Sequence, residues 1–249
     1  MLYGICPLSV VSVRVEPNDN NEVVTQLLYG DYFKIIEKRR KWSKIRIAYD
    51  AKEGWVLNVQ YQEISDVNYE KLNKEVPNHS NDIVAHIIIK EHVLMPIVLG
   101  SNITSSKLLN HHFEGACVQG AKNKSKLVDT ALLYLNTPYQ KGGKTPFGID
   151  SSGFAQMVYK INGYGLKRSA EEQSAQGAPL SFIEESEPGD LAFFDDKDGT
   201  INHVGIILKD NYIIHVNGAV RIDRLDHTGI FNSEEKMYSH QLRVIKKIV

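Results

Sequence analysis

The sequence predicts an α+β protein in which small all-β modules precede a domain of mixed helices and sheet. Residues 1–64 hold five short segments in which apolar and polar residues alternate, separated by turn residues, and this pattern is typical of a small β-barrel. Residues 124–249 begin with apolar residues at helical spacing and continue as strand-like segments. Helices followed by an antiparallel sheet indicate an α+β domain.

The N-terminal half divides into three regions. The five expected strands of 1–64 are "LSVVSVRV", "VVTQLLYG", "YFKIIEK", "WSKIRIAY" and "EGWVLNV". Residues 65–82 are polar and show no periodicity, so we expect them to be a linker. Strand-like segments return over 83–123 and predict a second, weaker β module.

In the C-terminal domain, 124–249, we expect a helix over 124–136, a glycine-rich turn "KGGKTPFG", a helix over 151–161 and a short polar helix around "SAEEQSAQ". The remaining expected elements form a β meander of "DLAFF", "HVGIIL", "NYIIHV" and "AVRIDRL".

Composition argues against several classes of partner. Lys and Arg number 29 and Asp and Glu 30, so no overall field attracts nucleic acid or an anionic membrane. The one basic run, "EKRRKWSK" at 37–44, lies between two expected strands, and we expect a solvated hairpin tip there rather than a nucleic-acid patch. Cys6 and Cys117 are far apart and match no metal-ligand spacing, so neither a disulfide framework nor a metal site is predicted.

The N-terminal stretch lacks a basic region, a long apolar region and a small-residue cleavage site. The longest apolar stretch, near "HVLMPIVLG", is too short to span a bilayer. We therefore expect a cytoplasmic protein without a membrane span. The same sequence would fit a periplasmic or exported protein from which a signal peptide had been removed.

A nucleophile position is predicted at the start of the 151–161 helix. Asp150 is a good N-cap for this helix, which places Ser151 in the first turn, at the positive end of the helix dipole. That position lowers the pKa of a cysteine and favours its thiolate, whereas a serine hydroxyl stays protonated until a base removes its proton. The position therefore suits sulfur better than oxygen. The expected apolar stripe is Phe154, Met157, Val158 and Ile161.

His203 and His215 supply a candidate base. They flank the turn "KDN" of an expected hairpin. A turn centred on Asp210 would pair His215 with Gly205, and one centred on Lys209 would pair the two histidines directly. Either register puts both imidazoles on one face, where His215 could orient His203 as general base. The alternative is that each is a half-buried histidine of the sheet.

These residues lie in motifs that resemble a known family. Residues 124–249 resemble the NlpC-type peptidases, papain-like cysteine enzymes that cut bacterial cell-wall peptides, in "PY" with "GG" at 138–143, "DSSGF", "PGDLAFF", "HVGI" and "IIHVNG". The family has Asp-Cys-Ser-Gly where this chain has Asp150, Ser151, Ser152 and Gly153. The N-terminal half is similar to bacterial SH3-like modules, in "VRVEP", "WSKIRI" and "EGWV". Such modules occur in the branch that cleaves between γ-D-glutamate and a diamino acid.

The resemblance implies a role for each matching residue. It places the nucleophile at Ser151, the base at His203 and the third polar residue at His215. Ser152 and Asp150 would line the pocket for the D-glutamyl group, and no metal or organic cofactor is implied. Asp50 or Glu53 would bind the free amine of L-alanine. The alternative is that both are solvated acids of a loop.

The implied substrate is a peptidoglycan stem peptide, L-Ala-γ-D-Glu-diamino acid, with a free N-terminal L-alanine, as in recycling of cell-wall peptides. The chain departs from the family at Ser151, Lys141, Lys52 and Ser169, where the family often has cysteine, an aromatic residue, tyrosine and an acid. These departures favour an alternative, a catalytically silent protein that binds muropeptides or a protein partner. A Ser/His hydrolase of another ester or amide is a third hypothesis, weakened by the lack of a Gly-x-Ser-x-Gly elbow.

Overall fold

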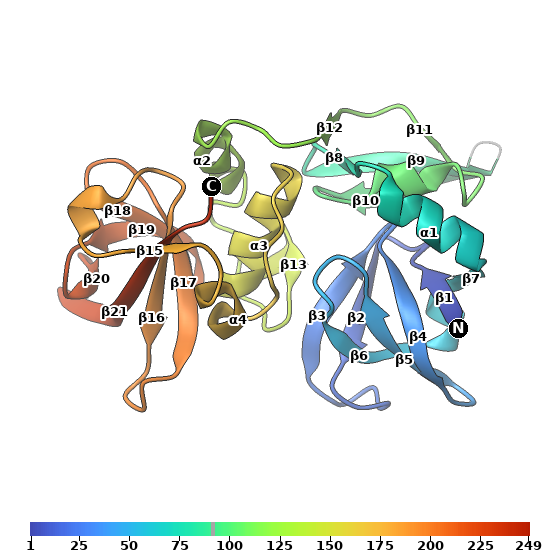
Figure 1. The fold of residues 1–249 in the computed structure, drawn as a ribbon, viewed down its shortest axis with the longest axis horizontal. Coiled ribbons are helices and arrows are strands. Elements are labelled where there is room, and N and C mark those ends of the chain that lie inside the picture. The colour runs from blue at the N-terminus through green and yellow to red at the C-terminus, as the bar shows by residue number, and fades with distance from the viewer. Residues whose placement is uncertain (91–92) are drawn as a thin grey trace. The chain divides into compact units, whose positions relative to one another are not determined.

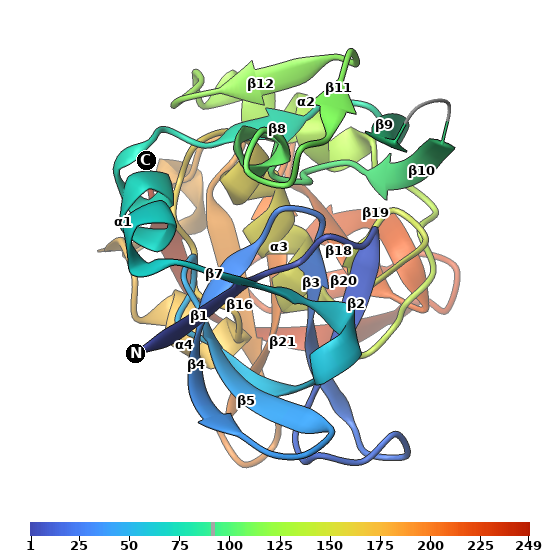
Figure 2. The ribbon, with the colours of Figure 1, turned by 90° about the vertical axis from the view of Figure 1, so that its right-hand side faces the viewer.

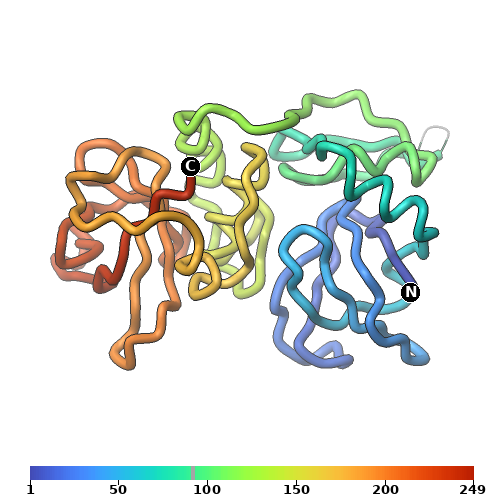
Figure 3. Tube along the Cα trace, in the orientation of Figure 1, coloured from blue at the N-terminus to red at the C-terminus, as the bar shows by residue number. Residues whose placement is uncertain are grey.

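The computed structural model describes residues 1–90 and 93–249, which divide into two compact units. Unit 1 comprises Met1–Ala121 and Lys141–Pro146, and unit 2 comprises Lys122–Gln140 and Phe147–Val249. Figure 1 and the tube in Figure 3 follow the chain through both units. No helix among the described residues is long and apolar enough to cross a membrane.

Unit 1 is built on a seven-stranded antiparallel sheet in the order β3-β2-β6-β5-β4-β1-β7. Its strands are β1 (Leu2–Ile5), β2 (Val10–Arg14), β3 (Val23–Leu28), β4 (Tyr32–Lys38), β5 (Trp42–Ile47), β6 (Glu53–Leu57) and β7 (Gln62–Ile64), with a 3-10 turn, η1, at Asn58–Gln60. The five expected strands are confirmed as β2 to β6. The basic residues Arg39, Arg40 and Lys41 are exposed between β4 and β5, which confirms a solvated hairpin tip.

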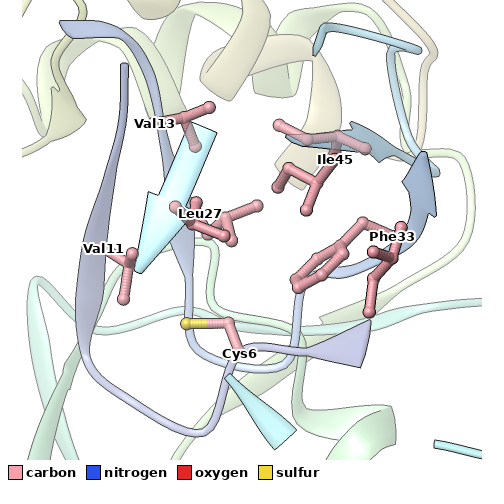
Figure 4. Packing of buried hydrophobic residues seen from close by; sticks show 9 residues of the cluster. Cys6, Val11, Val13, Leu27, Phe33 and Ile45 are labelled. Carbon is pink, nitrogen blue, oxygen red and sulfur yellow. The ribbon is translucent and has the colours of Figure 1, made fainter. Parts of the chain in front are cut away.

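The inward side chains of this sheet form a closely packed apolar cluster (Figure 4). Phe33, Ile45 and Leu27 are fully buried in it, as the alternation along their strands predicts. Because Ile45 has no access to solvent, removing one methyl group leaves a small void that its neighbours fill only partly.

We expect Ile45→Val to lower the free energy of unfolding of unit 1 by about 1 kcal/mol. Urea unfolding followed by Trp fluorescence would measure the loss. Ile36→Val on the neighbouring strand β4 is the matched control, because Ile36 is 46% exposed and should change stability by less than about 0.5 kcal/mol.

The segment 65–82 differs from the expected linker, because it contains helix α1 (Asp66–Lys74) and strand β8 (Asn78–Ser80). Ser65 caps α1 by accepting a hydrogen bond from Asn68 N at 3.2 Å. Only Tyr69 and Leu72 of this helix are buried, and Tyr69 stacks on Tyr3 with ring centroids 4.2 Å apart. Two buried side chains in nine residues give too weak a period to be recognised in the sequence.

Residues 83–123 form strands, as expected, although 91 and 92 lie outside the described residues. Strands β9 (Val84–Lys90), β10 (Val93–Val98) and β11 (His112–Phe113) make one sheet, β12 (Cys117–Gln119) pairs with β8, and Ile103–Ser106 is a 3-10 turn, η2. Their buried residues share a core with the first module, where Ile5 and Tyr29 pack with Ile87 and Ile97. Figure 2 shows these strands beside β1 to β7 within unit 1. The two β regions are thus joined through a common core.

Unit 2 begins with its helices and ends with its strands, which confirms the expected α+β order. The helices are α2 (Ser125–Leu132), α3 (Ser151–Ile161) and α4 (Ala170–Ser174), with a 3-10 turn, η3, at Ile183–Glu185. The strands are β14 (Gly148–Ile149), β15 (Ala178–Leu180), β16 (Leu191–Asp195), β17 (Ile201–Ile207), β18 (Tyr212–Asn217), β19 (Ala219–Leu225), β20 (Gly229–Asn232) and β21 (Met237–Lys247). Strand β13 (Lys144–Thr145) belongs to unit 1.

The sheet of unit 2 has the order β15-β21-β16-β17-β18-β19-β20, and a further pairing of β20 with β21 closes six of its strands into a barrel. Helix α3 packs against β17 and β18, beside which it lies in Figure 1. The expected stripe residues Phe154, Met157 and Val158 are fully buried. This packing fixes α3 and its first residues against the two strands that carry His203 and His215.

Candidate active site

Ser151 is the first residue of α3, and Asp150 is its N-cap, as the sequence predicts. Asp150 Oδ1 accepts a hydrogen bond from Gly153 N at 2.7 Å, and Asp150 O accepts one from Phe154 N at 2.8 Å. Among residues 1–90 and 93–249, no protein group accepts from the N–H groups of Ser151 or Ser152. Two N–H donors at the positive end of a helix can stabilise an oxyanion that forms beside residue 151.

Arg168 organises the start of α3 from outside the helix. Its Nη1 and Nη2 donate to the two carboxylate oxygens of Asp150 at 2.9 and 2.7 Å, and Nη1 also donates to Ser152 Oγ at 2.9 Å. Ser152 Oγ in turn donates to Asp150 Oδ1 at 3.3 Å. The Arg168 side chain is 4% exposed and that of Asp150 is 16% exposed. This bidentate pair holds a guanidinium and a hydroxyl next to Ser151 in fixed positions.

Gln173 ties the loop that carries Arg168 to α3. Its Nε2 donates to Ser152 O at 2.9 Å and to Lys167 O at 2.8 Å. Helix α4, which holds Gln173, is itself fixed by a capping box between Ser169 and Glu172. Ser169, noted in the sequence as a departure from the family, therefore has a structural role in this chain.

We expect Ser152→Ala to weaken binding of an anionic peptide group at this position. The hydroxyl both accepts from Arg168 and donates to Asp150, so its loss removes two hydrogen bonds to charged groups and loosens the guanidinium. The expected cost is about 1–3 kcal/mol in binding free energy, measured by calorimetry with a γ-D-glutamyl peptide. Ser174→Ala is the control, since Ser174 Oγ only caps its own helix by donating to Glu171 O.

His203 and His215 lie on neighbouring strands, and their rings form a hydrogen bond. Strand β17 pairs with β18 so that Gly205 lies opposite His215, which is the register expected for a turn centred on Asp210. His203 Nε2 and His215 Nδ1 are 3.0 Å apart. The structure therefore brings the two predicted histidines together. Both are buried, so the expectation of a shared face is confirmed.

Asp223 of β19 continues the chain of hydrogen bonds beyond His215. Its Oδ2 is 2.9 Å from His215 Nε2, and Arg221 Nε and Nη2 donate to Oδ2 and Oδ1 at 2.7 and 3.0 Å. Burial alone would raise the pKa of Asp223, but the hydrogen bonds from His215 and Arg221 outweigh it and hold the pKa below its ordinary value. Asp223 is thus a carboxylate at neutral pH.

His240 of β21 stacks on His203, with ring centroids 4.0 Å apart and an interplanar angle of 22°. Burial lowers the pKa of His240 to about 4, helped by the neighbouring His215. Burial also lowers the pKa of His203 well below its ordinary value, and His240 and His215 lower it further. Both rings are therefore neutral near pH 7, and neutral His203 has a lone pair with which to accept a proton.

Among the described residues, these three histidines are the one group that could hold a metal ion, because one ring nitrogen of each lies within 4.8 Å of the other two. The rings of His203 and His240 are nearly parallel, so their in-plane lone pairs do not converge on one point. The nitrogens of His203 and His215 that face each other are already joined by a hydrogen bond. The arrangement fits proton transfer better than tetrahedral metal ligation.

Three predicted features of the site stay predictions. Among the described residues no hydrogen bond joins Ser151 Oγ to His203, so their reaction geometry stays a prediction. Asp50 and Glu53 belong to unit 1, and their proposed role toward the α-amine stays a prediction as well. Asp50 Oδ1 accepts from Lys52 N at 2.9 Å, and Glu53 forms ion pairs with Arg46 and Lys44 at 2.6 and 3.1 Å.

Three site residues were not identified from the sequence: Arg168, Asp223 and His240. A site role for Arg168 could have been suspected from the sequence. It directly precedes the capping box of α4, where an isolated arginine is expected to pair with an acid. Asp223 and His240 carry no such signal.

Two domain families match parts of this chain. The NlpC/P60 family matches residues 136–241, and the bacterial dipeptidyl-peptidase SH3 domain matches residues 13–60. Dipeptidyl-peptidase 6 of Lysinibacillus sphaericus is 27% identical over an alignment of 256 positions, which covers 87% of this chain and 89% of that protein. Gamma-D-glutamyl-L-lysine dipeptidyl-peptidase of Bacillus subtilis (strain 168) is 23% identical over an alignment of 219 positions, which covers 79% of this chain and 73% of that protein.

A crystal structure of an NlpC/P60 family protein from Bacillus cereus ATCC 10987 superposes with a TM-score of 0.81, at 18% identity and over 99% of both chains. At this identity the likeness establishes the fold. It extends over the N-terminal β regions as well as the helices and barrel of unit 2.

Proposed function

Since the chain joins a bacterial SH3 domain to an NlpC/P60 peptidase domain, we propose that it acts on peptidoglycan stem peptides at the bond between γ-D-glutamate and the diamino acid. The observation that carries the proposal is the start of α3. Position 151 lies there beside the free N–H groups of Ser151 and Ser152 and next to the ion pair of Arg168 with Asp150. The helix packs against the strands that carry His203 and His215. Two similar proteins have names that include dipeptidyl-peptidase.

In the proposed reaction, the side chain of residue 151 attacks the γ-carbonyl carbon of D-glutamate. His203 takes the proton of the nucleophile and later gives it to the amine of the diamino acid, which leaves as the C–N bond breaks. The N–H groups of Ser151 and Ser152 stabilise the oxyanion of the tetrahedral intermediate. Water then releases L-Ala-D-Glu and restores residue 151.

The proposed substrate is a peptide with two charged ends. The guanidinium of Arg168 would bind the α-carboxylate of D-glutamate. The hydroxyl of Ser152 would join it by turning its proton from Asp150 Oδ1 to that carboxylate. Asp50 or Glu53 would bind the free amine of L-alanine, which restricts the substrate to peptides released from the wall. This restriction fits our further proposal of a cytoplasmic role in recycling.

Ser151 itself favours a second candidate function. A serine hydroxyl depends on its base far more than a thiol does, and the low pKa of His203 makes it a weak base. A protein with this site could retain the pocket and bind muropeptides, or a protein partner, without cleaving.

Incubation of the unchanged protein with L-Ala-γ-D-Glu-L-Lys and with the diaminopimelate peptide separates the two functions. Release of L-Ala-D-Glu, followed by mass spectrometry, supports the peptidase. Saturable binding without release supports the binding protein. Neither binding nor release of either peptide would contradict both.

A further inference from the structure

We infer that Asp223 is a positioning residue that fixes the proton of His215 on Nε2 and thereby leaves Nδ1 of His203 as the basic nitrogen of the site. The inference deepens the proposed function, because it identifies which atom of His203 would take the proton. It rests on distances within unit 2 and on the donor and acceptor capacity of each group.

The first step concerns the bond between Asp223 and His215. An ionised carboxylate has no proton to donate, so at 2.9 Å the proton must come from His215 Nε2. Arg221 binds both oxygens of the same carboxylate and Glu234 pairs with Arg221 at 3.1 Å. Asp223 therefore cannot turn away from His215 without breaking its pair with Arg221.

The second step concerns the two imidazoles. An imidazole that carries a single proton, held on Nε2, presents a lone pair at Nδ1. His203 Nε2, 3.0 Å away, must then be the donor. Because burial and its histidine neighbours keep His203 neutral, its second nitrogen, Nδ1, carries a lone pair. Asp223 thus determines, through two hydrogen bonds, which nitrogen of His203 accepts a proton.

The ring of His203 is held in this orientation from its other side. His240 stacks on it at 4.0 Å, and Phe194 of β16 lies with its ring centroid 5.7 Å away. Among the described residues, the charged or titratable groups in this chain of contacts are His215, Asp223, Arg221, Glu234 and His240. With His240 neutral, the only negative group that contacts the histidine pair directly is Asp223.

The experiment is a two-bond ¹H–¹⁵N NMR measurement of histidine tautomers in the unchanged full chain near pH 7. We expect the proton on Nε2 in both His215 and His203. In Asp223→Asn, the amide can donate to His215, so we expect His215 to move its proton to Nδ1. Asp226→Asn is the matched control, since Asp226 accepts from Tyr238 and should leave both tautomers unchanged.

Protonation of His215 on Nδ1 in the unchanged protein would overturn the inference, even if Asp223→Asn failed to fold. A folded Asp223→Asn protein with unchanged tautomers would also overturn it. In the Ser151→Cys protein we expect Asp223→Asn to lower kcat by about 10²-fold with little change in KM, and Asp223→Glu to recover part of the loss. If no variant cleaves any peptide while the tautomers respond as stated, the proposed function fails and the inference stands.

Discussion

Ser151→Cys is expected to raise cleavage of L-Ala-γ-D-Glu-diamino acid peptides by about 10³-fold or more over the unchanged protein. The first residue of α3 sits at the positive end of the helix dipole, where a thiol ionises near neutral pH and a hydroxyl does not. A thiolate needs little help from a base, so the low pKa of His203 limits it less than it limits serine. The rate of L-Ala-D-Glu release at pH 7 measures the effect.

The matched control moves the thiol by one residue. Ser152→Cys should show no gain in cleavage, because the side chain of residue 152 is directed at Arg168 and Asp150, and loss of its hydroxyl should weaken binding of the peptide as in Ser152→Ala. Adding His203→Ala to Ser151→Cys should remove most of the gain, because the leaving amine then has no group to protonate it. Suppose that Ser151→Cys folds and binds the peptide but shows no gain in cleavage. The differences from the family at Lys52, Lys141 and Ser169 would then indicate that the chain binds peptides without cleaving them.

Arg168→Ala is expected to lower the free energy of unfolding of unit 2 by about 3 kcal/mol, the lower end for breaking a buried ion pair. The substitution leaves the largely buried carboxylate of Asp150 without the guanidinium that binds both of its oxygens. It should also abolish measurable binding of γ-D-glutamyl peptides. Urea unfolding followed by circular dichroism measures the first effect and calorimetry the second.

Two further variants separate charge from geometry. Arg168→Lys keeps the charge but not the bidentate contact, so we expect an intermediate loss of stability. Arg243→Ala is the surface control, because Arg243 is 64% exposed and lies 3.6 Å from Asp195, where an ion pair contributes about 0–1 kcal/mol. Equal losses of unfolding free energy in Arg168→Ala and Arg243→Ala would contradict the role given to the buried pair of Arg168 and Asp150.

The local parts of this site could be predicted because they depend on neighbouring residues. An aspartate before a helix with an apolar stripe predicts a cap, and Asp150 is that cap. The turn "KDN" with strand residues on either side limited the pairing of β17 with β18 to two registers, of which the structure has the one with Gly205 opposite His215.

The distant parts could not be predicted, because they depend on packing. In β19, Ile222 is 38% exposed and the adjacent Asp223 is 3% exposed, which is the reverse of what alternation of apolar and polar residues suggests. His240 reaches the site only because β21 closes the barrel against both β16 and β20. Helix α1 was missed for the same reason, since its two buried side chains gain their partners from unit 1 as a whole.

The most direct test of the central claim is the covalent intermediate. The Ser151→Cys protein, mixed with L-Ala-γ-D-Glu-diamino acid and quenched in acid, should carry an L-Ala-D-Glu acyl group as a thioester, and proteolysis with mass spectrometry should place it on residue 151. An acyl group on another residue, or cleavage of the peptide with residue 151 unmodified at every quench time, would contradict the assignment of this position as the nucleophile.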